Sequence, residues 1–242
     1  MTDVRTTLES TSIAGDMVLA PDTAHEPDGF RRVAAVAGIA AVAVGMVTIP
    51  LMGSAPVLGD SAEDIGAYFA GNADLHRPAV VIAALLAIPI VLFFAGVHRA
   101  LVVSSGRSAS AWATVFLYGA IMMSATAGLK EALYAVAVRY AATDPDLGVL
   151  ALVSDSSAIA GATLGAWMAI TVGAVGVTAL RDRTAPRWYA GLCGLVTGLA
   201  VVSVIETVST STGGALSGAA FGAFILWMLT SAIVMLRRPL MA

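Results

Sequence analysis

The sequence predicts an all-α integral membrane protein, a bundle of six transmembrane helices. Of its 242 residues, 58% are hydrophobic and only 12% are charged, whereas soluble proteins carry about 25% charged residues. The mean hydropathy is +0.87. Because so few charged side chains cannot cover a globule in water, the composition excludes a soluble protein. It also excludes a disordered chain, collagen and a coiled coil.

Six apolar runs are long enough to cross a membrane, since about 20 apolar residues span the ~30 Å hydrocarbon layer. The predicted spans are residues 33–52, 78–97, 111–138, 158–180, 188–205 and 215–236. None of them alternates between apolar and polar side chains as a barrel strand does. The chain therefore divides into an acidic tail over residues 1–29, predicted to be disordered, and a transmembrane domain over residues 30–242.

The basic residues predict the orientation. One set of span ends carries Arg31, Arg32, His98, Arg99, Arg107, Arg181, Arg183, Arg187, Arg237 and Arg238. The other set carries Asp60, Glu63, Asp64, Asp74, Asp144 and Asp146, with only Arg77 and Arg139. Because cytoplasmic loops are rich in arginine and lysine, both termini are predicted to be cytoplasmic. Trp112 and Trp188 open their spans at the same inner interface.

The long outer loop, residues 53–77, contains a predicted amphipathic helix. Ser61 and Asp64 have the spacing of a capping box, with Ser61 as the N-cap. Ile65, Tyr68 and Phe69 then fall on one face of the helix. Two interpretations stay open, an anchor on the outer membrane surface and a lid across the mouth of the bundle.

Small residues at four-residue spacing predict close helix contacts, since they let two backbones approach each other in lipid. The pattern occurs at Gly161 and Gly165, at Gly194 and Gly198, and at Gly214, Gly218 and Gly222. Pro89 in the second span predicts a kink or a free carbonyl group.

Three short segments carry a family resemblance: residues 67–70 (AYFA), residues 94–101 (FAGVHRAL) and residues 185–188 (APRW). Over residues 30–238, the chain resembles a family of actinobacterial six-span membrane proteins that is known only as a domain of unknown function. The resemblance implies a six-helix bundle, and it implies no activity and no site residues. We therefore expect a multi-pass protein of the bacterial cytoplasmic (inner) membrane.

Ionisable residues near the spans form the candidate site. They are Lys130 and Glu131 in the third span, Asp155 just before the fourth, and Glu206 at the end of the fifth. A charge inside a span costs about 2.5–3.5 kcal/mol on insertion scales, so each is a functional hypothesis. At 1.5 Å per residue, Lys130 and Glu206 both lie about 27 Å from the inner interface. The four residues therefore share one layer near the outer interface.

The single lysine, Lys130, is the centre of this layer. Since Glu131 is about 100° away around the helix, Lys130 is predicted to pair with Asp155 or Glu206 across the bundle. Tyr134 lies one turn above Lys130 on the same face. These five residues predict an outward-facing polar pocket that binds or passes a small molecule or lipid. A structural interpretation stays open, in which Lys130 snorkels, the carboxylates reach water and an ion pair only fixes the helix register.

Two other functions are alternatives to this non-enzymatic binding protein. One is an enzyme at the outer leaflet that uses Glu131, Asp155 or Glu206 as its acid or base. The other is a structural or regulatory subunit that uses residues 1–29 as a docking segment. Its expected partner is a second copy of the chain or another membrane protein. No cofactor or metal site is predicted, because no two of the three histidines share a helix at the spacing of metal or haem ligands. The single cysteine, Cys193, makes no intrachain disulfide, and no basic patch indicates nucleic-acid binding.

Overall fold

The computed structural model describes residues 28–52, 56, 58–104, 109–143, 146–183, 185–209 and 215–237. These residues form seven helices and no strand. The helices are α1 (Asp28–Met52), α2 (Ala62–Gly71), α3 (Ala73–Ser104), α4 (Ala109–Tyr140), α5 (Leu147–Arg181), α6 (Arg187–Ser209) and α7 (Ala215–Arg237). All except α2 are long and apolar enough to cross a membrane. The prediction of an all-α, multi-pass membrane protein with six spans is thereby confirmed.

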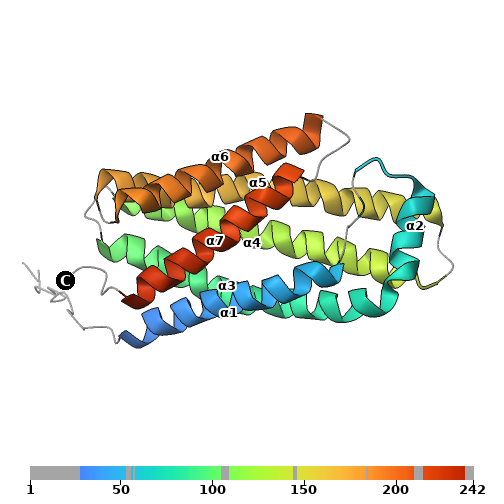
Figure 1. Cartoon of the computed structure of the whole chain (residues 1–242), viewed down its shortest axis with the longest axis horizontal. Helices are drawn as coiled ribbons and strands as arrows, with labels where there is room; N and C mark the ends of the chain where they lie inside the picture. Colours follow the sequence, from blue (N-terminus) through green and yellow to red (C-terminus); the bar gives the residue numbers. More distant parts are fainter. Residues whose placement is uncertain are drawn as a thin grey trace, which may run out of the picture.

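The six long helices form a ring (Figure 1). Each long helix packs against the next one along the chain, and α7 closes the ring by packing against α1. Trp227 of α7 is fully buried inside the ring. Its indole stacks on Phe224 and meets Phe93 of α3 edge to face, with ring centroids 5.9 Å apart. Asp28 and Arg237, the two ends of the described chain, lie at the same end of the bundle.

The helices differ in length, and the longer ones project beyond the shorter ones at one end of the bundle. α3, α4 and α5 have 32, 32 and 35 residues, and α1, α6 and α7 have 25, 23 and 23. At 1.5 Å per residue, the first three reach about 48–52 Å and the others about 35–38 Å. Figure 1 shows that α3, α4 and α5 continue beyond α6 and α7 at the end opposite the chain termini.

Three helices begin five or more residues earlier than the hydropathy pattern predicts, and α1 is one of them, since it begins at Asp28 and not at residue 33. α3 begins at Ala73 and not at residue 78, and α5 begins at Leu147 and not at residue 158. The Asp146 side chain caps α5 by accepting hydrogen bonds from the backbone N–H groups of Gly148 and Val149. Asp155 therefore lies inside a helix and not before it. Hydropathy marks only the apolar part of each helix, whereas the additional turns of α3 and α5 are stabilised by this cap and by contact with α2.

Ser61 is the N-cap of the short helix α2, as the capping-box spacing predicts. The Ser61 hydroxyl oxygen accepts from the N–H of Asp64 at 3.1 Å, and the hydroxyl donates to the Asp64 carboxylate at 2.7 Å. Ile65 and Phe69 are buried, and they pack with Tyr134 and residues of α4 and α5. The apolar face of α2 is thus covered by the ends of α4 and α5, across which α2 stands in Figure 1.

Asn72 joins α2 to α3. Its side-chain amide donates to the carbonyl of Tyr68, which ends α2. Its own carbonyl accepts from the N–H groups of Leu75 and His76, which begins α3. One residue thus sets the angle between the two helices and places His76 in the first turn of α3.

The predicted glycine contacts are confirmed only on α5. A Cβ atom at Gly165 would lie 2.9 Å from Val204 of α6, and one at Gly161 would lie 3.6 Å from the Lys130 side chain. By contrast, Cβ atoms at Gly194, Gly198, Gly218 and Gly222 would meet nothing within 4 Å. The prediction of close packing within the described chain is wrong for these four, because they lie on exposed helix faces. Gly214 lies outside the described residues.

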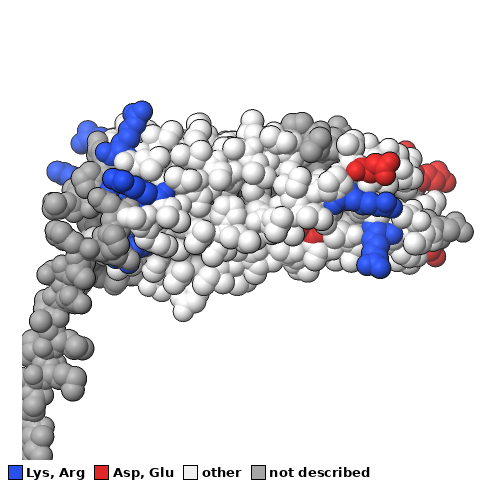
Figure 2. Space-filling view, turned by 90° about the horizontal axis from the view of Figure 1, so that it is seen from below, with Lys and Arg blue, Asp and Glu red and all other residues white. Residues whose placement is uncertain are grey.

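Charge is separated between the two ends of the bundle. On the face in Figure 2, the only charged side chains seen at the end that holds the chain termini are basic, and the α2 end shows acidic side chains together with basic ones. A wide band with few charged residues lies between the two ends. The predicted tail, residues 1–29, lies outside the described residues except for its last two, which belong to α1.

Candidate functional site

Lys130 pairs with its neighbour Glu131. The Lys130 Nζ atom lies 3.0 Å from Glu131 Oε1, and the two side chains are 33% and 27% exposed. The predicted pairing of Lys130 with Asp155 or Glu206 is wrong. Neighbouring Cα–Cβ bonds point about 100° apart on a helix, but the flexible four-carbon stem of lysine lets the ammonium group reach around the helix.

The rest of Lys130 holds α4 against α5. Gly161 leaves room on α5 for the Lys130 stem, whose Cδ and Cε atoms lie beside it. One turn earlier on α5, the Ser157 hydroxyl donates to the backbone carbonyl of Lys130 at 3.2 Å. These two contacts fix the register of α4 and α5 at the ion pair.

Asp155 lies on the side of α5 away from this contact. It precedes Ser157 by two residues, which is about 200° around a helix. Since Ser157 faces Lys130, Asp155 is turned away from Lys130, and its side chain is half-buried. The clustering of Ser154, Asp155 and Ser156 suggests a helix start in the sequence, but the Ser156 hydroxyl donates to the carbonyl of Leu152 within α5.

Glu206 is used as a helix cap. Its Oε2 atom accepts a hydrogen bond from the backbone N–H of Leu216 at 3.2 Å. Leu216 lies in the first turn of α7, where backbone N–H groups have no partner inside the helix and favour a negative charge. Glu206 therefore connects the end of α6 to the start of α7.

Glu131 retains an unused acceptor. Its Oε1 atom is paired with Lys130, while its Oε2 atom is buried and has no hydrogen-bond partner among the described residues. A buried carboxylate oxygen without a partner is costly. This oxygen therefore has unused capacity to accept a hydrogen bond.

A cavity of about 170 Å³ lies between the long helices. Residues of α3, α4, α5, α6 and α7 line it, and Gly161, the residue that touches the Lys130 stem, is one of them. Its walls are mostly apolar, with Phe94, Met168 and Phe224 among the large side chains. Hydroxyl groups come from Ser124, Ser203 and Ser217. None of the five predicted site residues lines this cavity.

Tyr134 lies further out on α4, under α2. Its hydroxyl is 3.1 Å from the hydroxyl of Tyr68 on α2, which identifies a hydrogen bond between the two helices. The Tyr134 ring also packs against Phe69 and His76, with centroids 5.5 and 5.6 Å away. Burial raises the pKa of the Tyr68 phenol above its usual value of 10.0. The Tyr68 hydroxyl is therefore protonated at neutral pH and able to donate.

His76 is the least expected member of this aromatic cluster. It is fully buried, and neither ring nitrogen has a hydrogen-bond partner among the described residues. Tyr68, Phe69 and Tyr134 surround its ring at centroid distances of 4.8–5.9 Å. In the described part of the chain, no group of three or more His, Cys, Asp or Glu side chains is arranged to hold a metal ion.

The sequence prediction did not include His76, Tyr68 or Phe69 among the site residues. The aromatic residues of α2 form one face of an amphipathic helix, so they were recognisable as a packing surface. Nothing in the spacing of Tyr68 and Tyr134 predicts their contact, because it depends on how α2 folds back over α4.

No protein-family model matches the chain, and neither a curated protein nor a solved structure matches it. The resemblance to an actinobacterial six-span family therefore stays a prediction.

Proposed function

We propose that this multi-pass membrane protein binds an amphipathic small molecule or lipid. The polar group of the ligand contacts Lys130 and Glu131, and its apolar chain occupies the cavity between α3 and α7. One observation carries the proposal: Gly161 both lines the cavity and touches the Lys130 stem, so the ion pair and the apolar space adjoin.

The size and the apolar walls of the cavity favour the alkyl chain of a ligand over a compact polar ligand. Ligand pockets for drug-sized molecules usually measure about 300–1,000 Å³, whereas this cavity measures about 170 Å³. An apolar cavity of about 150 Å³ accommodates benzene. The space therefore suits one part of an amphiphile, while the polar part remains outside at the partly exposed ion pair.

The orientation is part of the proposal. We place both termini in the bacterial cytoplasm and the Lys130–Glu131 pair at the outer side of the cytoplasmic membrane. The arginine-rich end that carries the termini supports this orientation, since basic residues remain on the cytoplasmic side. The ligand then approaches from the α2 end of the bundle.

The contacts of the carboxylates favour binding over catalysis. Glu206 is a helix cap, and Glu131 is held by Lys130. An acid or base at the outer leaflet would need a carboxylate within reach of a reacting group and with a suitable pKa. The subunit alternative depends on residues 1–29, which lie almost entirely outside the described residues.

The test is binding of 12-bromododecanoic acid to the full chain in detergent, followed by quenching of tryptophan fluorescence. Trp227 is a suitable reporter because it stacks on Phe224, which lines the cavity. Ala127→Phe fills the cavity from α4, and Ala125→Phe on the exposed side of α4 is the matched control. If the phenyl ring of Ala127→Phe keeps two methylene groups of the ligand out of the cavity, binding weakens about tenfold. Equal affinities of the two variants would refute binding in the cavity.

A second variant tests the polar group. Lys130→Met removes the charge and keeps an unbranched apolar stem. We expect weaker binding of 12-bromododecanoic acid and unchanged binding of uncharged 12-bromododecanol. Equal effects on the two probes would show that Lys130 acts only through packing.

A further inference from the structure

Two hollows adjoin at the end of the bundle opposite α2. The first, the arginine hollow, measures about 420 Å³ and is lined by Ala179, Leu180, Arg183, Ala185, Pro186 and Arg187. The second, the α6–α7 groove, measures about 270 Å³ and is lined by Pro186, Trp188, Thr230, Ile233, Val234 and Arg237. Pro186 is a wall of both. A cationic space and a partly apolar space therefore meet at one residue.

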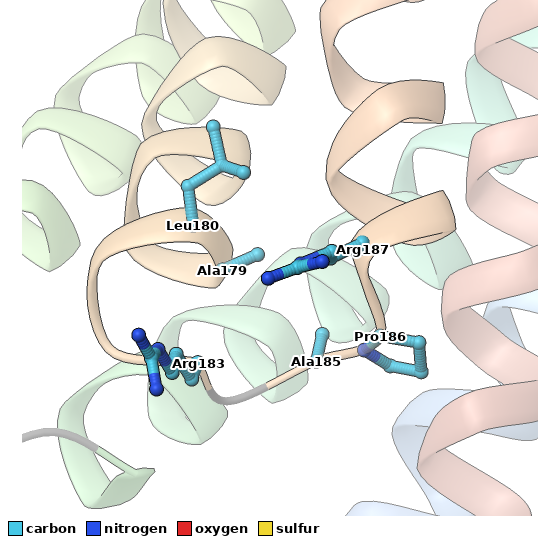
Figure 3. Close-up of a pocket in the computed structure, with 6 residues that line it drawn as sticks. All are labelled: Ala179, Leu180, Arg183, Ala185, Pro186 and Arg187. Atoms are coloured by element: carbon cyan, nitrogen blue, oxygen red, sulfur yellow. The ribbon is translucent and has the colours of Figure 1, made fainter.

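The cations of these hollows are not neutralised within the described chain. Among the described residues, Arg183, Arg187 and Arg237 form no ion pair with a carboxylate. Figure 3 shows Arg187 reaching from the start of α6 toward the last turn of α5, with Arg183 bordering the hollow from the loop. Each guanidinium group presents a planar fork of N–H donors that matches two oxygens of a phosphate group.

The backbone at Arg183 is independent support for a role of its side chain. Arg183 has a φ of 51°, the left-handed conformation, and it follows Asp182, the C-cap of α5. Glycine is the usual residue at this position because a side chain is strained there. An arginine here is less favourable for the fold than glycine, which leaves its guanidinium group as a reason for its presence.

We propose that the arginine hollow and the α6–α7 groove together bind one anionic phospholipid. Arg183 and Arg187 hold the phosphate group, and an acyl chain lies along Ile233 and Val234. Trp188, which is 58% exposed, borders the same groove, as expected for an aromatic residue at the membrane interface. Basic pockets between membrane helices on the cytoplasmic side recognise anionic headgroups. This site is separate from the cavity of the proposed function.

The test measures retained lipids by native mass spectrometry of the full chain with dioleoylphosphatidylglycerol or dioleoylphosphatidylcholine. We expect one phosphatidylglycerol to be retained in preference to phosphatidylcholine. Arg183→Gln with Arg187→Gln should reduce this preference about 30-fold, as estimated for two arginines near an anionic headgroup. The control combines Arg32→Gln and Arg181→Gln, which remove the same charge from exposed positions at the same end outside both hollows.

Equal losses in the two double variants would overturn the proposal and indicate a diffuse effect of surface charge. Displacement of phosphatidylglycerol by millimolar inorganic phosphate would overturn the lipid assignment in favour of a phosphate site. Arg183→Gly covers the case in which the double variant does not fold, since glycine accepts the left-handed conformation. It should reduce the preference about fivefold and raise Tm, whereas an unchanged preference would exclude Arg183 from the site.

Discussion

Replacing Gly165 by alanine tests the packing of α5 against α6. The new Cβ atom would lie 2.9 Å from a methyl carbon of Val204, 3.3 Å from the backbone carbonyl oxygen of Ala200 and 3.3 Å from Ser203 Oγ. Carbon atoms in favourable contact are about 3.5–4.0 Å apart. Val204 is β-branched and has one strongly preferred rotamer in a helix, and the carbonyl cannot rotate away. The helices must therefore separate or distort.

The magnitude follows from comparison with Gly198→Ala. Both replacements gain the same helix propensity, about 1 kcal/mol, and a Cβ atom at Gly198 would meet nothing within 4 Å. Overpacking costs about 1–3 kcal/mol. The difference between the two variants is therefore about 2 kcal/mol, or about 6 °C in Tm for a chain of this size.

The assay is thermal unfolding of the purified protein in one detergent, followed by circular dichroism. A second pair repeats the comparison at another level of the same interface. A Cβ atom at Gly176 would lie 2.9 Å from Cys193 Cβ, whereas one at Gly194 would meet nothing within 4 Å. Gly176→Ala should therefore lower Tm relative to Gly194→Ala.

Equal Tm values for Gly165→Ala and Gly198→Ala would refute the close contact at Gly165. A larger loss for Gly198→Ala would refute it more strongly, since it would show that the exposed face of α6 packs against another helix. In that case, a concentration-dependent Tm of the unmodified chain would identify a second copy as the partner.

Three further predictions concern the α2 end of the bundle. His76→Leu should stabilise the protein by about 1–3 kcal/mol, because neither buried ring nitrogen has a partner among the described residues; a lower Tm would contradict this. Tyr68→Phe and Tyr134→Phe should show a coupling of about 0.5–1.5 kcal/mol in a double-mutant cycle, and additive effects would argue against their hydrogen bond. Ser61→Ala removes a cap worth about 1 kcal/mol, so amide exchange in α2 should accelerate about fivefold; unchanged exchange would show that tertiary contacts alone hold α2.

Features that depend on local sequence were predictable. Hydropathy identifies the six spans because each must provide enough apolar surface to cross the hydrocarbon layer. Ser61 is recognisable as a cap because its hydrogen bond to Asp64 joins residues three apart. The starts of α3 and α5 were not predictable in the same way, because their outer turns exceed the apolar run and are stabilised by contact with α2.

Features that depend on side-chain direction or on distant segments were not predictable. Counting residues from the inner interface predicts similar heights for Lys130, Asp155 and Glu206, but height does not determine which side chains face each other. Asp155 is turned about 200° from the residue that contacts Lys130, and Glu206 is held by the N-terminus of α7. The burial of His76 depends on the turn at Asn72, which no periodic pattern reveals.

Helix length explains why the two ends of the bundle differ in chemistry. At the arginine-rich end, adjoining hollows are lined by Arg183 of the loop after α5, Arg187 of α6 and Arg237 of α7. At the other end, α6 and α7 end earlier, and α3, α4 and α5 continue beyond them to the ends that α2 packs across. The two proposed sites therefore share no side chain, and effects at such separated sites should be additive. Arg183→Gln with Arg187→Gln should leave the binding of 12-bromododecanoic acid unchanged, and a linked loss would show that one ligand or one conformational change serves both ends.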